Sequence, residues 1–249
     1  IKSESKISFK ENHQLIINYF KKIEPKTGWG NIYYGNALLN NGEIEKGKKY
    51  IIQGYTDGSF SRKEQSQILK NFKTILEENH HKKRIEQLLW NGKYRTASRL
   101  VKYVNIDYQK LFEARIGLIS FAGGVDDLIK KVPDQLKSDP GLVYDRIHWR
   151  IKKRKYDSAL NLLLEINNTD SSKLVRPDKF WGKKNFLIRK LIDRHEYNTA
   201  YKLSINHGLK ENKDIAEAEW MAGWISLTFL ENPETAYLHF KEIWDVSSR

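Results

Sequence analysis

Apolar residues recur along this chain at the three- and four-residue spacing that is typical of amphipathic helices. One helical segment follows Ser61 and Glu64, which have the spacing of a capping box, and carries apolar residues at positions 68, 69, 72, 75 and 76. A second covers residues 216–230, where Ala222 and Gly223 indicate close contact with a neighbouring helix. A third covers residues 185–194, with one apolar stripe of Phe186, Leu187, Leu191 and Ile192. The pattern predicts helices and no strands.

A short motif recurs between these segments: a turn, a large residue, two further positions and then a small residue. The copies place the small residue at Gly47, Ala97, Ala159, Ala200 and Ala236. The last three copies are spaced by 41 and 36 residues, and Leu128 lies in a degenerate copy midway between Ala97 and Ala159. We expect the turn to end one helix and the large residue to pack back onto it. The small residue, one turn into the next helix, then lets the two backbones approach.

Two-helix units with a period in the thirties and forties are typical of α-solenoids, and the tetratricopeptide consensus contains the same step. The sequence therefore predicts an all-α protein with one superhelical domain over residues 1–249. We expect an irregular, tetratricopeptide-like α-solenoid of antiparallel helix pairs, with roughly 12–15 helices. The alternative is a non-repeating helical bundle in which the turns resemble one another by chance.

Composition narrows the classes of function. The chain has no cysteine, which excludes disulfide scaffolds, cysteine-ligated zinc, iron–sulfur clusters and thiol catalysis. No stretch of about 20 apolar residues is present, so no membrane span is expected. The net charge of +13 favours an acidic partner such as nucleic acid, anionic lipid or a cell-wall polymer. Because lysine is scattered along the chain, a solvated basic surface is the alternative interpretation.

Candidate reactive groups do not form a recognisable catalytic or metal-binding pattern. The seven histidines lack a metal-ligand spacing, so neither a metal nor another cofactor is expected. Adjacent acidic pairs such as Asp126 and Asp127 point to different faces of a helix and cannot flank one bond. The chain begins at Ile1 without a basic and apolar leader, and we interpret it as a mature protein or a fragment truncated at both ends.

Several segments together resemble the helical superhelix region of the soluble lytic murein transglycosylases. The segments that carry the resemblance are residues 139–150, Trp181, 187–191, 196–203, 207–209 and 217–230. The resemblance implies a periplasmic location and an all-α superhelix that carries a lysozyme-like catalytic domain at its C-terminal end. In that family a glutamate in a Glu-Ser pair cleaves the MurNAc–GlcNAc linkage and leaves a 1,6-anhydro product. The one Glu-Ser pair here, Glu4-Ser5, lacks the motifs that should follow, so no catalytic residue is assigned and the catalytic domain is absent.

The resemblance implies a non-catalytic role: shaping access to the active site and holding peptidoglycan during cleavage. The expected partners are the glycan strands and acidic stem peptides of peptidoglycan and the protein's own catalytic domain, with no nucleic acid. The candidate glycan-binding residues are Trp181, Lys183, Lys184 and Arg189, with Lys190, Trp149, Trp220 and Trp224 as further candidates. The tryptophans have helical spacing and are alternatively core residues.

The densest basic run, residues 150–155, falls at the end of a predicted helix, where the helix dipole stabilises cations. A docking patch for an acidic polymer is the alternative interpretation of this run. A tetratricopeptide-like scaffold for protein interaction, with no role at the cell wall, is the main alternative function. An RNA-binding helical repeat is a third, supported by charge alone, and it lacks the base-reading position that each unit would need.

Overall fold

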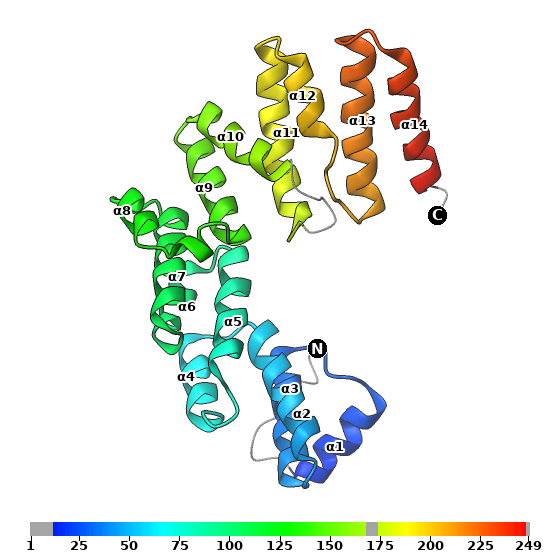
Figure 1. The fold of residues 1–249 in the computed structure, drawn as a ribbon. Coiled ribbons are helices and arrows are strands. Elements are labelled where there is room, and N and C mark those ends of the chain that lie inside the picture. Colours follow the sequence, from blue (N-terminus) through cyan, green and yellow to red (C-terminus); the bar gives the residue numbers. More distant parts are fainter. Residues whose placement is uncertain (1–11, 168–173, 248–249) are drawn as a thin grey trace. The chain divides into compact units, whose positions relative to one another are not determined.

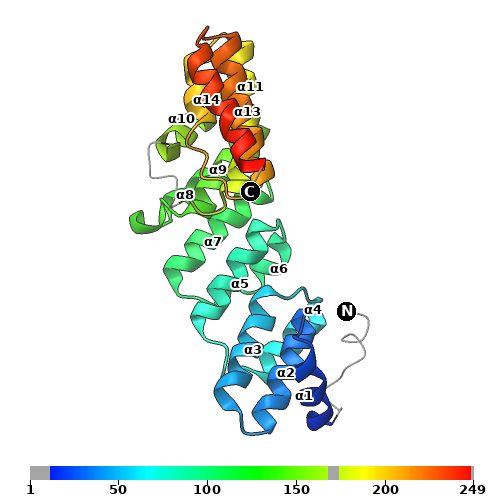
Figure 2. The same ribbon diagram turned by 90° about the vertical axis from the view of Figure 1, so that its right-hand side faces the viewer.

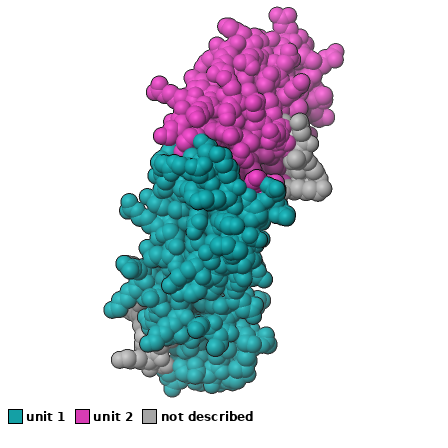
Figure 3. Space-filling view, turned by 60° about the vertical axis from the view of Figure 1, so that its left-hand side comes forward, with its two compact units in different colours: residues 1–136 teal, residues 137–249 magenta. Residues whose placement is uncertain are grey.

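The computed structural model describes residues 12–167 and 174–247, and these residues form fourteen α-helices, two short 3₁₀ helices and no strand (Figure 1). The all-α prediction is confirmed, and helices pack mostly against the helices that precede or follow them along the chain. No helix in the described ranges has the length and apolar character that crossing a membrane requires. The chain folds into two compact units, unit 1 with residues 1–136 and unit 2 with residues 137–249 (Figure 3).

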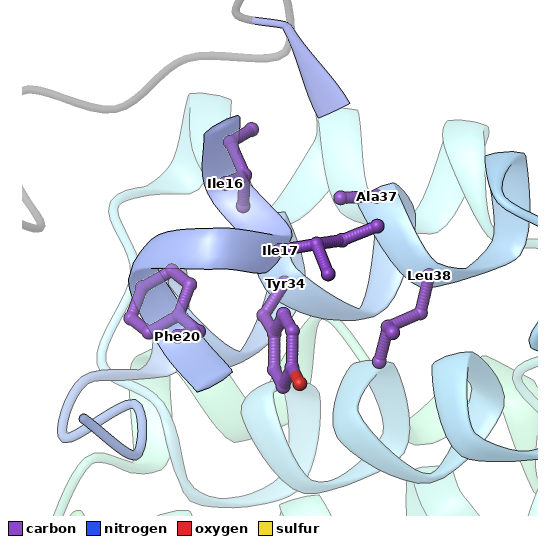
Figure 4. Packing of buried hydrophobic residues seen from close by; sticks show 6 residues of the cluster. All are labelled: Ile16, Ile17, Phe20, Tyr34, Ala37 and Leu38. Atoms are coloured by element: carbon purple, nitrogen blue, oxygen red, sulfur yellow. The ribbon is translucent and has the colours of Figure 1, made fainter. Parts of the chain in front are cut away.

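Unit 1 contains eight of the α-helices. They are α1 (His13–Lys22), α2 (Gly28–Asn40), α3 (Ile44–Asp57), α4 (Arg62–Asn71), α5 (Glu78–Trp90), α6 (Tyr94–Ser98), α7 (Ile106–Ile119) and α8 (Val125–Lys130). Helices α1, α2 and α3 lie side by side in both ribbon views (Figures 1 and 2). The apolar faces of α1 and α2 meet in one cluster, in which Ile17 and Leu38 are fully buried (Figure 4).

Unit 2 contains the remaining six helices: α9 (Pro140–Lys152), α10 (Tyr156–Asn167), α11 (Pro177–Asp193), α12 (Tyr197–Ser204), α13 (Asn212–Thr228) and α14 (Pro233–Ser247). Helices α9, α11 and α13 form one row. The ring of Tyr144 meets that of Phe180 at 5.4 Å between α9 and α11, and Trp181 of α11 donates to Glu217 of α13. Helices α10, α12 and α14 form the second row, with Tyr201 hydrogen-bonded to His239 between α12 and α14.

The recurring motif has one structure in all five of its copies. The residue five positions before the small one has a positive φ in each, from +50° to +87°, at Gly42, Gly92, Arg154, His195 and Glu231. The next helix begins three positions before the small residue, and the small side chain or glycine is buried every time. The residue with the positive φ ends the first helix, as in a Schellman turn. This shared turn is why the same short pattern recurs in the sequence between helices.

In two copies of the motif the large residue makes ring contacts that were not predicted. The ring of Tyr156 lies 5.7 Å from that of Phe186, and Tyr197 stacks on Phe229 at 4.6 Å. Both partners belong to the helix pair that follows, whereas we expected contacts with the preceding helix. These rings therefore join successive helix pairs.

Helices α2 and α3 approach most closely along two glycine pairs. Gly28 and Gly35 of α2 are seven residues apart, as are Gly47 and Gly54 of the antiparallel α3. A Cβ atom on Gly35 would lie 2.7 Å from the carbonyl oxygen of Gly47, and one on Gly54 would lie 2.6 Å from that of Gly28. Glycine is required here because backbone atoms occupy the space of a side chain.

Two other predicted segments form with small changes. The capping box at Ser61 and Glu64 is present, but α4 ends at Asn71, and Phe72 and Leu76 enter the core from the turn that follows. In α13 the predicted close contact is found at Gly223, where a Cβ atom would lie 2.7 Å from the ring of Phe240 in α14.

Candidate functional site on helix α11

All four of the candidate residues lie on α11, which begins with Pro177 in its first turn. The buried face of this helix repeats at three- and four-residue intervals, through Trp181, Lys184, Ile188 and Leu191. Those residues fix how the helix packs on its neighbours. The structure does not bring the four candidates together, because this packing divides them between the interior and two parts of the surface.

Trp181 and Lys184 belong to the interior. Trp181 is 5% exposed, and its indole Nε1 donates to Glu217 Oε2 at 3.2 Å. Lys184 is 1% exposed, and its Nζ donates to the carbonyl oxygen of Asn206 at 3.2 Å. Burial lowers the pKa of Lys184 to about 8. Both side chains are therefore buried, and their polar ends bond to other parts of the protein.

Lys183 and Arg189 lie at the surface. The Lys183 ammonium group is half-buried and lies 5.5 Å from the centre of the Tyr144 ring, on the side of α9. Arg189 is exposed on the side of α13. Its Nε donates to Asn185 Oδ1 at 3.0 Å, and Asn185 Nδ2 in turn donates to Glu217 Oε1 at 2.6 Å. This chain of hydrogen bonds orients the guanidinium group along the surface between α11 and α13.

Arg189 borders a cavity of about 430 Å³ that we call the aromatic–basic groove. The residues that line it are Phe186, Arg189, Lys190, Ile192, Asp193 and Trp224. Residues 186, 189, 190 and 193 follow one face of α11, and Trp224 comes from α13. The volume falls in the range of about 300–1,000 Å³ that is usual for small-ligand sites.

Trp224, which lines the groove, belongs to a stacked pair of tryptophans. Trp220 and Trp224 are one helical turn apart in α13, with ring centres 5.7 Å apart and planes 15° from parallel. Trp220 is 49% exposed, and the edge contact of Phe229 with Trp224, at 5.1 Å, holds the second ring in place. Trp220 is therefore a surface residue and Trp224 is partly buried, so neither is a fully buried core residue.

The groove has the chemistry of a binding site. An aromatic face packs against the apolar face of a planar or ring-shaped ligand, and a guanidinium group bonds carboxylates through paired donors. Among the described residues, Asp193 is the one carboxylate that lines the groove, and it forms an ion pair with Lys190 at 3.2 Å.

Sequence reasoning missed Phe186 as part of this site. We predicted it in the buried stripe of α11, whereas it is 37% exposed and lines the groove. The available signal was spacing: Phe186, Arg189, Lys190 and Asp193 share one helical face, offset from that of Leu187 and Leu191.

The basic run at residues 150–155 has the predicted structural role. Helix α9 ends at Lys152, with Arg150 and Lys152 in its last turn. The ammonium groups of Lys153 and Lys155 lie 5.9 and 5.2 Å from the ring of Trp149. The helix terminus and the tryptophan ring therefore account for the position of this charge.

Two other polar features can be compared with the groove. Glu219 accepts hydrogen bonds from His207 Nε2 at 3.1 Å and His239 Nδ1 at 2.5 Å, while Leu209 N–H and Tyr201 OH bond to the other ring nitrogens. This chain of hydrogen bonds satisfies both histidine rings and joins α12, α13 and α14.

In unit 1 a cavity of about 650 Å³ carries both acidic and basic side chains. Across residues 12–167 and 174–247, no three potential ligands are grouped so as to hold a metal ion.

Comparisons with protein-family models, with curated proteins and with solved structures gave no match to this chain.

Proposed function

We propose that this chain is the non-catalytic superhelical region of a periplasmic soluble lytic murein transglycosylase. In this proposal it holds peptidoglycan through the aromatic–basic groove and shapes access to a catalytic domain that lies outside the chain. That domain would cleave the MurNAc–GlcNAc linkage. The observation that carries the proposal is the groove itself, where the partly buried ring of Trp224, stacked on the exposed ring of Trp220, lines the same cavity as Arg189 and Lys190.

The chemistry of the groove supports a glycan with acidic substituents. Sugar rings present an apolar face that stacks on tryptophan, and the stem peptides of peptidoglycan carry carboxylates that match Arg189 and Lys190. A net charge of +13 adds a general attraction to such a polymer. Each exposed charge contributes little alone, so we expect attachment to be weak and to fade as salt is raised.

The helix arrangement supports the superhelix. Five hairpins share one turn geometry, and in unit 2 the six helices form two rows, as in stacked helix-pair repeats. In such repeats one row lines the binding surface. The groove lies on the row of α9, α11 and α13, so a strand that crosses this row would meet successive helices.

The main alternative is a tetratricopeptide-like scaffold that binds an acidic peptide. The same groove favours it, because Arg189 and Lys190 match aspartate and glutamate side chains as well as stem-peptide carboxylates. The stacked tryptophans favour the glycan, because a sugar ring uses a flat aromatic platform.

Sedimentation with purified peptidoglycan sacculi tests the proposal. We expect the double variant R189A/K190A and the single variant W224A each to reduce the bound fraction several-fold. The control K210A/K241A removes two exposed lysines away from the groove and should bind like the unchanged protein. Binding that is equal in all variants would refute the groove as the site. Failure to bind sacculi, together with binding of an acidic peptide, would favour the scaffold.

A further inference from the structure

Arg189 is held at the aromatic–basic groove by a chain of hydrogen bonds that begins on α13. Its Nε donates to Asn185 Oδ1 at 3.0 Å, one helical turn earlier in α11. Asn185 Nδ2 donates to Glu217 Oε1 of α13 at 2.6 Å, and the indole of Trp181 donates to Glu217 Oε2 at 3.2 Å. Glu217 therefore uses both of its oxygens to join α11 to α13 beside the groove.

The direction of each hydrogen bond in this chain follows from the chemistry of its two ends. A carboxylate only accepts hydrogen bonds, and a guanidinium group only donates them. The amide of Asn185 lies between these two groups, so its nitrogen faces Glu217 and its oxygen faces Arg189. Glu217 thus determines, through the amide of Asn185, which nitrogen of Arg189 is occupied within the protein.

Occupation of Nε leaves the two terminal nitrogens of Arg189 for a ligand. Within residues 12–167 and 174–247, Nη1 and Nη2 of Arg189 have no hydrogen-bond or ion-pair partner. The side chain is exposed, and it lines the groove. A guanidinium group can bind a carboxylate with two parallel hydrogen bonds, and Nη1 and Nη2 together form one edge that can do so.

The other charges that line the groove leave a net charge of one cation. Lys190 already forms an ion pair with Asp193 at 3.2 Å, so these two charges oppose each other. Arg189 bonds instead to a neutral amide and keeps its charge for a ligand. Trp224 lines the same cavity of about 430 Å³ and supplies a ring surface. The lining therefore matches a ligand with one carboxylate close to a ring.

We propose that Arg189 binds one carboxylate of a ring-containing ligand end-on, and that Glu217 is the positioning residue that prepares Arg189 through Asn185. The inference rests on the proposed function in one respect, because the aromatic–basic groove is the binding site in both. It adds the recognised group, and it predicts that a ligand without this carboxylate binds much more weakly. The carboxylate can belong to a sugar acid or to an aromatic acid, and the test separates these two sources.

The first test is an NMR titration of the full chain with two matched pairs of probes, followed through the indole of Trp224. N-acetylmuramic acid is compared with N-acetylglucosamine, which lacks the carboxylate, and benzoate is compared with the neutral benzamide. We expect the acid of at least one pair to bind at least tenfold more tightly than its neutral partner. R189K should abolish this preference, because lysine cannot form two parallel hydrogen bonds, and K210A/K241A should keep it. The pair that shows the preference identifies the source of the carboxylate.

The variant E217Q tests the positioning role. Its new amide should turn its oxygen toward Trp181, because that indole is buried and has little access to water as another partner. The new amide nitrogen then faces Asn185, whose amide must turn over and present its own nitrogen to Arg189 Nε. We expect the Nε–H proton of Arg189, assigned through R189K, to exchange with water several-fold faster, and the preferred acid to bind several-fold more weakly.

The double variant N185D/E217Q is the matched rescue, because it exchanges the carboxylate and the amide without a change of net charge. The new carboxylate at position 185 accepts from both neighbours, so slow exchange of the Arg189 Nε–H proton should return. A merely structural role of Glu217 would not predict this reversal.

Three results would overturn the proposal: equal binding of acid and neutral probe in both pairs, no binding of either acid, or exchange at Arg189 Nε that E217Q leaves unchanged. These results are separate from the sacculus experiment. Binding of benzoate that depends on Arg189 and Glu217 would support this inference even if the protein does not bind sacculi. Sacculus binding that depends on Trp224 but not on Glu217 would refute this inference and leave the proposed function in place.

Discussion

Replacement of Gly35 by alanine tests the close approach of α2 and α3. A Cβ atom at this position would lie 2.7 Å from the carbonyl oxygen of Gly47, 2.8 Å from Ile51 Cγ1 and 2.9 Å from Ile51 N. Two of these three atoms belong to the backbone of α3, so rotation of a side chain cannot relieve the overlap. The two helices must therefore move apart. Overpacking of this kind costs about 1–3 kcal/mol, and backbone contacts lie at the upper end of that range.

The helix propensity of alanine opposes this cost and has to be measured separately. Alanine is favoured over glycine by about 1 kcal/mol inside a helix. Gly182 of α11 provides the matched control, because a Cβ atom there meets nothing within 4 Å. We expect G182A to raise the free energy of unfolding by about 0.5–1 kcal/mol and G35A to lower it by about 1–2 kcal/mol. The difference between the two variants isolates the steric cost.

Urea unfolding followed by far-ultraviolet circular dichroism measures both variants, and hydrogen exchange locates the change. Amides of α2 and α3 should exchange faster in G35A, because their shared packing is weakened. If G35A proves as stable as G182A, the two helices are not in contact at Gly35 and Gly47, and the packing described for unit 1 is wrong.

Three further predictions concern buried charge. R84M should lower the free energy of unfolding of unit 1 by about 3 kcal/mol, as measured by urea unfolding. The reason is that Arg84 is fully buried and donates to the carbonyl oxygens of Tyr55 and Gly58 at the end of α3. Unchanged stability would contradict this prediction. Burial raises the pKa of Glu219, but hydrogen bonds from two histidines outweigh it and lower the pKa to about 2. The stability that Glu219 contributes is therefore complete above its ordinary pKa of 4.5 and is lost as the pH falls toward 2, a loss that E219Q should remove from an acid unfolding series. Lys184, with a pKa of about 8 against an ordinary 10.5, should make the protein more stable as the pH rises through this window, and K184M should abolish that rise.

The turns of this fold could be predicted from sequence because their determinants are local. Gly42 and Gly92 tolerate a positive φ, and the small residue follows five positions later. Arg154, His195 and Glu231 adopt the same conformation without being glycine. In these three copies the turn was predicted from the alanine five positions later. Local chemistry thus fixed where helices begin and end.

Contacts between helices could not be predicted from the sequence in the same way. In the degenerate copy of the motif a large residue, Leu128, stands where the other copies have a small one. The small residue is instead Gly117 of the preceding helix, where a Cβ atom would lie 2.6 Å from the Leu128 side chain. Lys184 was predicted as a candidate glycan-binding residue, yet its ammonium group reaches a carbonyl oxygen inside unit 2, an uncommon position for lysine. Such pairings depend on which residue faces which across two helices, and one sequence does not contain that information.

The claim that the aromatic–basic groove binds glycan is tested most directly by NMR of the tryptophan indoles. The ligand is a soluble peptidoglycan fragment that contains MurNAc, GlcNAc and stem peptide, and the indoles of Trp220 and Trp224 are assigned through W220F and W224F. We expect these two resonances to shift together and saturate, while that of the buried Trp181 responds weakly, and we expect R189A/K190A to weaken the response several-fold. Binding of the fragment without a change at Trp220 or Trp224, or no binding at all, would contradict it.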